Sequence, residues 1–362
     1  MNECSSRRYC VSSPGKCLIT GGYLILDEGN QGLSLALSAR CVCDVCVLTS
    51  SERIFRLSII SPEINGKWMY CVHEDGQIVA VEQSEENPFV YYSIVETLRY
   101  LKSKRTHLMG KQIDLVLSSH GSFYYCQGNT MIKLGFGSSA TTVVSIVTLL
   151  LLESHSITRL LVEGERELIS CLSRKAHNTA QGRVGSGFDV VTAVFGSCVF
   201  ERKGSECVHS PFHLPSSVSI ALSCGNQSSS TPILIHRVKK WRQREEAKRI
   251  WKEYAMNNAS IVQVLREGSD MKELKRLYEE KLEIMHSISR CSNSGIVPDE
   301  LYTIIKETLR LRGVIGCAVA GAGGFDSFYC LYDSQQVRPS QLESIWSQAG
   351  CQVSSIVEGH DG

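Results

Sequence analysis

The pattern of apolar and polar positions predicts strands followed by helices in the first part of the chain. Short β-branched runs separated by turn residues predict strands at 33–37, 41–48, 55–60 and 113–117. Asn87-Pro88 followed by apolar residues at helical spacing predicts a helix to about residue 101. Residues 140–152 are apolar on every side of a helix and are expected to be buried.

The later part of the chain reads as a strand, several helices and a second strand. Residues 218–222 predict a strand, Thr231-Pro232 begins a basic helix, and 271–289 and 299–311 predict amphipathic helices. A strand at 314–320 leads into Gly321-Ala322-Gly323-Gly324. Because His209, Pro211 and Pro215 would interrupt a regular element, we expect two domains, 1–210 and 211–362.

Composition narrows the class of protein. Of 362 residues, 43% are hydrophobic and 21% charged, as in ordinary globular proteins, and the net charge of +1 argues against nucleic-acid or membrane-surface binding. The longest apolar run, 143–152, is shorter than the roughly 20 residues of a membrane span. No apolar run follows Arg7 and Arg8 as a signal peptide requires, so a cytoplasmic protein is expected.

The 16 cysteines include no CxxC pair. Cys41, Cys43 and Cys46 lie in an alternating run, where Cys46 would face away from the other two. We therefore interpret the cysteines as reduced structural residues rather than metal ligands.

A loop rich in glycine and serine is the first candidate for chemistry. Lys133, Gly135, Phe136, Gly137, Ser138, Ser139 and Ala140 lead directly into the buried helix, whose first amides can bind an anion. The hydroxyls of Ser138 and Ser139 suit phosphate oxygens or Mg²⁺. The GxxxxGK[ST] pattern is absent, and a plain serine N-cap is the alternative.

Three further segments hold candidate groups. Lys16 follows Ser13-Pro14-Gly15, expected to be a stiff turn, although a solvated lysine is equally compatible. Asp189 follows Gly185-Ser186-Gly187, although it could simply cap a helix. Ser229, Ser230 and Thr231 precede a helix start that could bind a second anion, and the basic residues behind them are mostly a solvated face, with one or two expected to take part: Arg237, Lys239, Lys240, Arg242 and Arg244.

Taken in order, these motifs resemble those of the GHMP kinases. Ser13–Lys16, 135–140 and 321–324 match its three motifs. Within that superfamily the chain looks most like the plant and fungal phosphomevalonate kinases, through these stretches: 21–27, 176–189, 229–232 with 238–241, 321–326 and, more weakly, 87–90.

The resemblance implies an α+β protein with the GHMP kinase fold. An N-terminal α+β domain would pack on a C-terminal ferredoxin-like domain, with the active site in the cleft between them. It implies ATP and Mg²⁺ as cofactors and 5-phosphomevalonate as the substrate, converted to its diphosphate in isoprenoid and sterol precursor synthesis. A mevalonate kinase or a non-catalytic GHMP protein is the alternative; Lys16, Asp189 and the loop glycines favour an enzyme. A monomer or homodimer is expected.

The resemblance also assigns residues. Lys16 and Asp189 would be catalytic, and the loop residues Lys133, Gly135, Phe136, Gly137, Ser138, Ser139 and Ala140 would bind ATP. The substrate would contact Lys16, Tyr23, Ser186, Gly187, Asp189, Ser229, Ser230, Thr231, Gly321, Ala322, Gly323 and Gly324. Mevalonate kinases have a Mg²⁺-binding glutamate where this chain has Asn178, so Ser139 is the expected metal ligand.

The chemistry of the acceptor phosphate suggests which groups contribute most to catalysis. A phosphate monoester has a second pKa near 6 and is largely ionised at neutral pH, so a general base is scarcely needed. We therefore expect Lys16, Mg²⁺ and the loop amides to dominate by neutralising charge, while Asp189 holds Lys16 and orients the acceptor.

Overall fold

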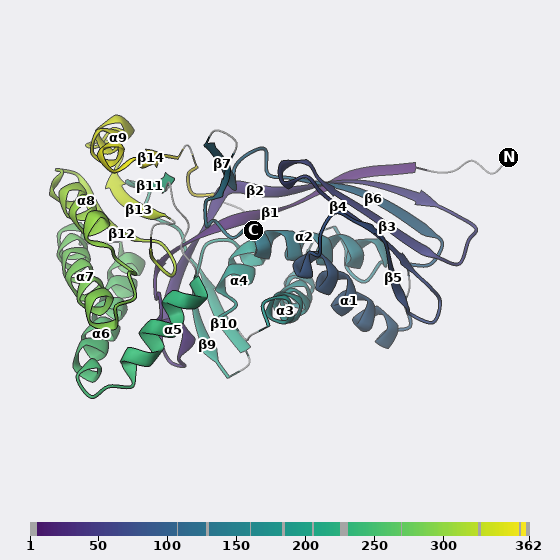
Figure 1. The fold of residues 1–362 in the computed structure, drawn as a ribbon, viewed down its shortest axis with the longest axis horizontal. Helices are drawn as coiled ribbons and strands as arrows, with labels where there is room; N and C mark the ends of the chain where they lie inside the picture. Colours follow the sequence, from purple (N-terminus) through teal and green to yellow (C-terminus); the bar gives the residue numbers. More distant parts are fainter. Residues whose placement is uncertain are drawn as a thin grey trace.

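The computed structural model describes residues 6–106, 108–127, 130–159, 161–182, 185–204, 206–224, 231–268, 270–324, 327–354 and 356–359. Within these ranges the chain forms a large sheet and a smaller sheet, each packed against helices (Figure 1). Helices α1 to α4 lie along one side of the large sheet, and α6, α7 and α8 lie beside the smaller one (Figure 1).

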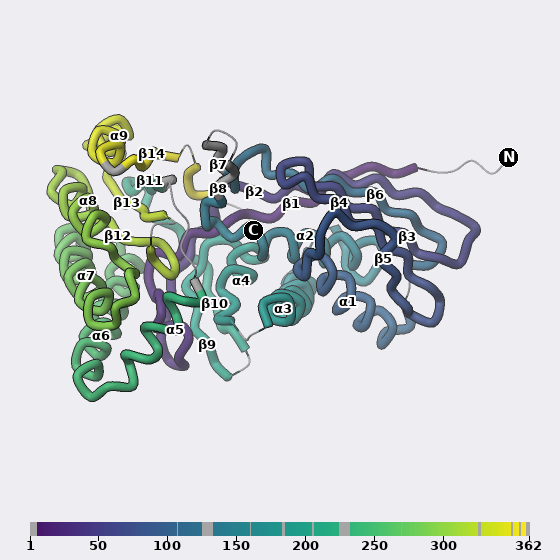
Figure 2. The backbone as a smooth tube through the Cα atoms, in the orientation of Figure 1, coloured from purple at the N-terminus to yellow at the C-terminus, as the bar shows by residue number. Residues whose placement is uncertain are grey.

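The large sheet has the strand order β10-β9-β2-β6-β3-β4-β5, with β1 also pairing with β2. Its strands are β1 (Ser6–Thr20), β2 (Gln31–Thr49), β3 (Phe55–Ser61), β4 (Gly66–Val72), β5 (Ile78–Gln83), β6 (Lys111–Ser118), β9 (Cys198–Lys203) and β10 (Glu206–Pro211). A separate hairpin, β7 (Tyr124–Gln127) and β8 (Thr130–Lys133), leads into the glycine loop (Figure 2).

Two predictions about these strands are wrong. The segments 33–37 and 41–48 are strand as predicted, but the break expected between them is absent: both are parts of β2, because β1 pairs with it almost from end to end and β-bulges absorb the irregularities. The segment 206–211 forms β10 despite His209 and Pro211, because β10 is an edge strand and Pro211 is its last residue. The alternation predicted for the cysteines holds, since Cys41 and Cys43 are buried and Cys46 is only partly so.

The helices of this half are α1 (Pro88–Ser103), α2 (Ser138–Glu153), α3 (Glu163–Ala180) and α4 (Phe188–Phe195). Helix α1 begins as predicted, with the Asn87 side chain accepting hydrogen bonds from the amides of Phe89 and Val90. Helix α2 is buried almost all round, as its composition predicts.

The smaller sheet has the order β12-β13-β11-β14, and all of its pairs are antiparallel. Its elements are β11 (Val218–Cys224), α5 (Thr231–Arg242), α6 (Ala247–Glu267), α7 (Met271–Ser292), α8 (Asp299–Arg310), β12 (Val314–Val319), β13 (Phe328–Asp333), α9 (Pro339–Trp346) and β14 (Gln352–Val353). This order is that of a ferredoxin-like βαββαβ unit with extra helices between its first two strands. The α+β class and the ferredoxin-like second half are therefore confirmed.

The two halves are packed against each other. One hydrophobic cluster includes residues of both sheets, among them Ile19 of β1 and Tyr329 of β13. The end of the chain returns to the large sheet, where the amide of Gly359 donates to the Ala36 carbonyl over 2.9 Å. The change of sheet falls between Pro211 and Val218, next to the predicted boundary at 210/211, which itself stays a prediction.

Candidate active site

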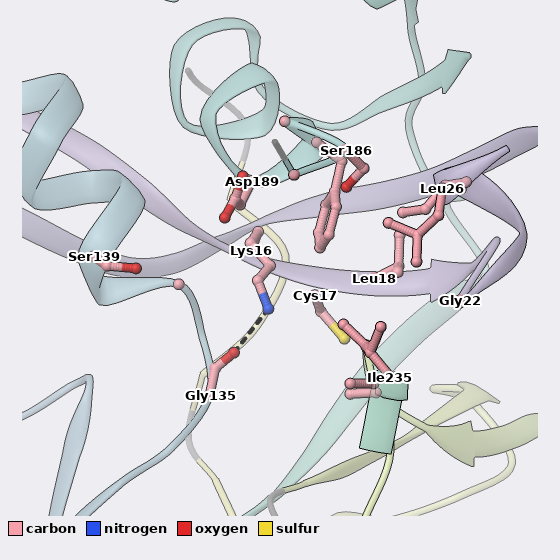
Figure 3. Close-up of a pocket in the computed structure, with 18 of the residues that line it drawn as sticks. Lys16, Cys17, Leu18, Gly22, Leu26, Gly135, Ser139, Ser186, Asp189 and Ile235 are labelled. Atoms are coloured by element: carbon pink, nitrogen blue, oxygen red, sulfur yellow. Dashed lines mark hydrogen bonds between the residues drawn. The ribbon is translucent and has the colours of Figure 1, made fainter. Parts of the chain in front are cut away.

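A cavity of about 460 Å³ lies where β1, the glycine loop, α4, α5 and the loop after β12 meet. Most sequence-predicted site residues line it: Lys16, Tyr23, Lys133, Gly135, Phe136, Gly137, Ser139, Ser186, Gly187, Asp189, Gly321 and Ala322. Figure 3 shows how Lys16, Ser139, Asp189 and Ile235 are arranged around it. Segments that are far apart in the sequence thus contribute to one site.

Lys16 is held against the glycine loop by two hydrogen bonds. Its amide donates to the Phe136 carbonyl over 2.8 Å. Its Nζ donates to the Gly135 carbonyl, also over 2.8 Å (Figure 3). The predicted turn at Pro14-Gly15 is wrong: both residues continue β1, with a bulge between Pro14 and Lys16. A Cβ on Gly15 would lie 2.8 Å from the Phe123 ring, so only glycine lets the strand approach this closely.

The glycine loop presents the start of α2 to the cavity. Gly137 is the N-cap, with φ of 88°, and having no side chain it leaves the first amides of α2 uncapped. The alternative of a serine N-cap is therefore wrong. Ser139 lines the cavity, whereas Ser138 and Ala140 are buried and do not. An uncapped helix start of this kind is suited to binding an anion.

Asp189 is the second residue of α4 and lies in its first turn. Gly187 is the N-cap, with φ of 76°, so the interpretation of Asp189 as the capping residue is wrong. One carboxylate oxygen, Oδ1, accepts from the amide of Val190 over 2.9 Å. The side chain lines the cavity and is 20% exposed. Whether it holds Lys16 stays a prediction; the Lys16 ammonium donates to the Gly135 carbonyl.

His177 is a site residue that the sequence interpretation did not assign. It lies on the buried face of α3, is 3% exposed, and lines the cavity. Its Nε2 is 3.2 Å from Ser139 Oγ and 3.7 Å from Asp189 Oδ2. The signal was available, because Ile169, Ser173 and His177 recur at intervals of four on a helix face.

Asn178, the neighbour of His177, has a different task. Its Oδ1 accepts from the amide of Gly185 over 2.9 Å, so it holds the loop that precedes α4. Asn178 therefore helps to position Asp189 indirectly, by holding the backbone of the loop before α4.

The third glycine segment meets the first motif across the cavity. Tyr23 OH donates to the Ala322 carbonyl over 2.5 Å. Gly321 and Ala322 line the cavity, while Gly323 and Gly324 are buried behind them. Gly323 has φ of 79°, and a Cβ there would collide with the Ile296 carbonyl, so the tight turn requires glycine.

Helix α5 contributes the cavity wall opposite the glycine loop. Ile235 and Lys239, one helical turn apart, line it, and Lys239 is thus one of the few basic residues expected to take part. Thr231 is the first residue of α5, so the helix begins one residue earlier than predicted from the Thr-Pro pair, which placed the N-cap at Thr231. Ser229 and Ser230 lie outside the described residues.

Comparison with known proteins relates this site to kinases. No protein-family model matches the chain. It is 26% identical to the phosphomevalonate kinase of Candida albicans, over 90% of each chain. It is 24% identical to the peroxisomal phosphomevalonate kinase of Arabidopsis thaliana, over 89% of each chain.

Solved structures give the same fold. Phosphomevalonate kinase of Streptococcus pneumoniae, in complex with phosphomevalonate and AMPPNP, aligns with a TM-score of 0.70 at 16% identity, covering 96% of this chain and 99% of the other. Mevalonate kinase of Methanococcus jannaschii gives 0.69 at 14%, covering 98% and 99%. The chain has the GHMP kinase fold, and its predicted resemblance to phosphomevalonate kinases is confirmed. None of the described helices is both long and apolar enough to cross a membrane.

Proposed function

We propose that this chain is an ATP-dependent phosphomevalonate kinase, which transfers the terminal phosphoryl group of ATP to the phosphate of phosphomevalonate. The main observation is that Lys16, the uncapped start of α2 and the Gly321–Ala322 turn meet at one cavity. The curated relatives named phosphomevalonate kinase, each matched over about nine-tenths of this chain, support the choice of acceptor.

The charges around the cavity suit two anionic substrates. Lys16, Lys133 and Lys239 line it from three different elements, and the amides of α2 add a positive dipole end. Because the acceptor oxygen is already largely ionised, the main obstacle is repulsion between two anions. Fixed positive groups lower that repulsion and position the reactants, which is most of what phosphoryl transfer needs.

We assign Asp189 an orienting role rather than that of an essential base. It is placed by two backbone features, the Gly187 N-cap and its own bond to the Val190 amide. A carboxylate there can fix the acceptor or Lys16 without accepting a proton in the transfer.

The residues present fit a magnesium ion held with the nucleotide. Ser139 and Asp189 provide oxygen donors that lie 3.2 and 3.7 Å from the same His177 nitrogen. This is the pattern expected for Mg²⁺, which takes one or two protein ligands and completes its shell with phosphates and water. When bound, Mg²⁺ would neutralise phosphate charge.

We propose that Lys239 contacts the acceptor's phosphate. The hydrogen bonds of Lys16 hold it beside the glycine loop, at the proposed nucleotide end of the cavity, whereas Lys239 lines the cavity from α5. Ile235 and the Tyr23–Ala322 contact would enclose the rest of the acceptor.

We propose a cytoplasmic location, where reduced structural cysteines are expected. Cys317 and Cys330 are directly opposed in β12 and β13, and both are free. Such a pair is expected to stay reduced in the cytosol. The Arabidopsis relative is named peroxisomal, so imaging of a fluorescently tagged chain would distinguish the two locations.

An ADP-release assay with three separate acceptors tests the function. We expect turnover with phosphomevalonate and only background with mevalonate or diphosphomevalonate. Turnover with mevalonate alone would instead identify a mevalonate kinase. Nucleotide binding without turnover of any acceptor would support a non-catalytic protein.

A further inference from the structure

Three side chains converge on one buried nitrogen beside the proposed nucleotide site. His177 Nε2 lies 3.2 Å from Ser139 Oγ, 3.4 Å from Gln181 Nε2 and 3.7 Å from Asp189 Oδ2. The last distance is too long for a hydrogen bond, whereas the first two are within reach of one. Ser139 and Gln181 are therefore the direct partners of His177.

The chemistry of the partners indicates which way the protons point. The Gln181 atom nearest His177 is the amide nitrogen, which can only donate. In the tautomer protonated on Nδ1, the Nε2 atom is an acceptor, and its single lone pair is shared between the Gln181 amide and the Ser139 hydroxyl. A serine that donates its proton backward keeps its oxygen lone pairs directed toward the cavity.

The histidine ring is held in place independently of these bonds. It packs against Phe89, with ring centroids 5.3 Å apart, and Phe89 lies in the first turn of α1, beside the Asn87 cap. The residue is also buried, with only 3% of its surface exposed. A fixed ring can hold the Ser139 hydroxyl in one rotamer.

We propose that His177 is a positioning residue that accepts a hydrogen bond from the Ser139 hydroxyl and so aims the Ser139 oxygen at the metal ion bound with ATP. This rests on the proposed function, since it assumes a magnesium–nucleotide complex at the start of α2. Groups that orient a metal ligand from behind affect metal affinity by about 10–100-fold.

Two variants separate this role from a merely structural one. His177→Phe keeps a ring against Phe89 but removes the acceptor, whereas His177→Gln retains an oxygen that can accept. His209→Phe is the matched control, because His209 is a half-buried histidine whose ring likewise packs against a phenylalanine, Phe195, but it does not line the cavity.

The measurement is ADP binding by isothermal titration calorimetry, with Mg²⁺ and with EDTA, in the full-length chain. For His177→Phe we expect about 10–100-fold weaker binding with Mg²⁺ and less than about threefold change in EDTA. His177→Gln should recover most of the loss, and His209→Phe should behave as the parent. In turnover, the KM for MgATP should rise while the KM for phosphomevalonate stays unchanged.

The inference would be overturned by equal losses in Mg²⁺ and EDTA, or by unchanged binding in a folded His177→Phe protein. Thermal unfolding of each variant establishes that it is folded. If the parent itself does not bind ADP, the proposed function fails; if the parent binds and His177→Phe binds equally well, only the role of His177 fails.

Discussion

Lys16 and Asp189 are expected to contribute unequally at the residue scale. Lys16→Met removes a fixed cation from between two anions, so kcat/KM should fall by about 10³–10⁵-fold, the range seen for cationic groups in phosphoryl transfer. Asp189→Asn keeps the shape of an orienting group and should leave measurable turnover. Steady-state ADP release compares them, and equal, complete loss in both would indicate obligate base catalysis.

Lys239 and Lys240 form a natural matched pair. They are neighbours on α5, but only Lys239 lines the cavity. We expect Lys239→Met to raise the KM for phosphomevalonate about tenfold, equivalent to roughly 1.4 kcal/mol, and to leave the KM for ATP unchanged. Lys240→Met should leave both constants unchanged. An unaltered acceptor KM in Lys239→Met would rule out this contact.

Single residues were predictable where a local pattern constrains them. Lys16, the loop glycines and Asp189 stand in motifs with turn or helix-start chemistry, and the structure brings them to one cavity. His177 and Lys239 stand in ordinary helices, and their importance depends on which turn of the helix faces the cavity. Only the packing of α3 and α5 determines that.

At the scale of elements, Glu153, the last residue of α2, binds the C-terminal end of this helix to the large sheet. The buried carboxylate accepts from Tyr9 OH over 2.7 Å and from Lys111 Nζ over 3.0 Å, and it pairs with Arg7. Burial opposes ionisation, but these bonds outweigh it and lower the pKa of Glu153 below its usual value. Helix α2, which begins at the proposed phosphate site, is therefore held at its other end by an ionised carboxylate.

Glu153→Gln should destabilise the protein by about 1–3 kcal/mol at neutral pH, since it weakens charge-assisted hydrogen bonds. Because the folded pKa is depressed, the ionised form stabilises above the unfolded pKa of about 4.3, and this contribution is lost as the pH falls through the folded pKa. Urea unfolding should show a constant difference between about pH 5 and 8 that shrinks at lower pH. Glu74→Gln, at an exposed pair with Arg53, is the control and should change little.

Helices and strands with a clear apolar pattern could be predicted from the sequence. Elements whose formation depends on pairing with a neighbouring strand could not. Strand β3 and helices α1 and α8 follow their own periodicity closely, whereas α2 was predictable because its sequence is apolar on every side. Strand β5 is almost wholly exposed, so it shows no alternation, and it forms because β4 offers an unpaired edge. Strand β2 continues through Ser38 and Arg40 because β1 pairs alongside.

At the scale of the whole molecule, a buried lysine joins the two halves. Lys281 of α7 donates to the Ile19 carbonyl of β1 over 2.8 Å, three residues from Lys16. Tyr329 OH donates to the same carbonyl. Burial lowers the pKa of Lys281 to about 7. Between about pH 7 and 10.5 the unfolded chain therefore binds more protons, so this group makes the protein more stable as the pH rises.

Lys281→Met should remove the cost of burying this amine, while Tyr329 continues to satisfy Ile19. We expect the variant to exceed the parent's stability by about 1–4 kcal/mol at pH 6, with the gain shrinking toward pH 9. Urea midpoints at both pH values measure it. Lys272→Met, at an exposed site on the same helix, should show no such pH dependence; a lower stability of Lys281→Met at pH 6 would contradict the prediction.

The arrangement of the strands and helices in space could be predicted from the sequence only in part. Periodicity predicts helices and strands, but the order β12-β13-β11-β14 depends on pairings between distant segments that no local pattern specifies. The ferredoxin-like half was expected only through the resemblance of short motifs, such as Gly321–Gly324, to known kinases. The structure shows that residues of these motifs line one cavity, which explains why they could act together.

The most direct test of the central claim is the chemical identity of the product formed from ATP and phosphomevalonate. Phosphorus NMR of the reaction distinguishes a diphosphate from two separate phosphate esters, because only phosphorus atoms that share a bridging oxygen show mutual coupling. We expect a new pair of coupled resonances from the acceptor, appearing in step with ADP. Uncoupled monoester signals alone, or ADP release without a new acceptor signal, would contradict a kinase that phosphorylates a phosphate.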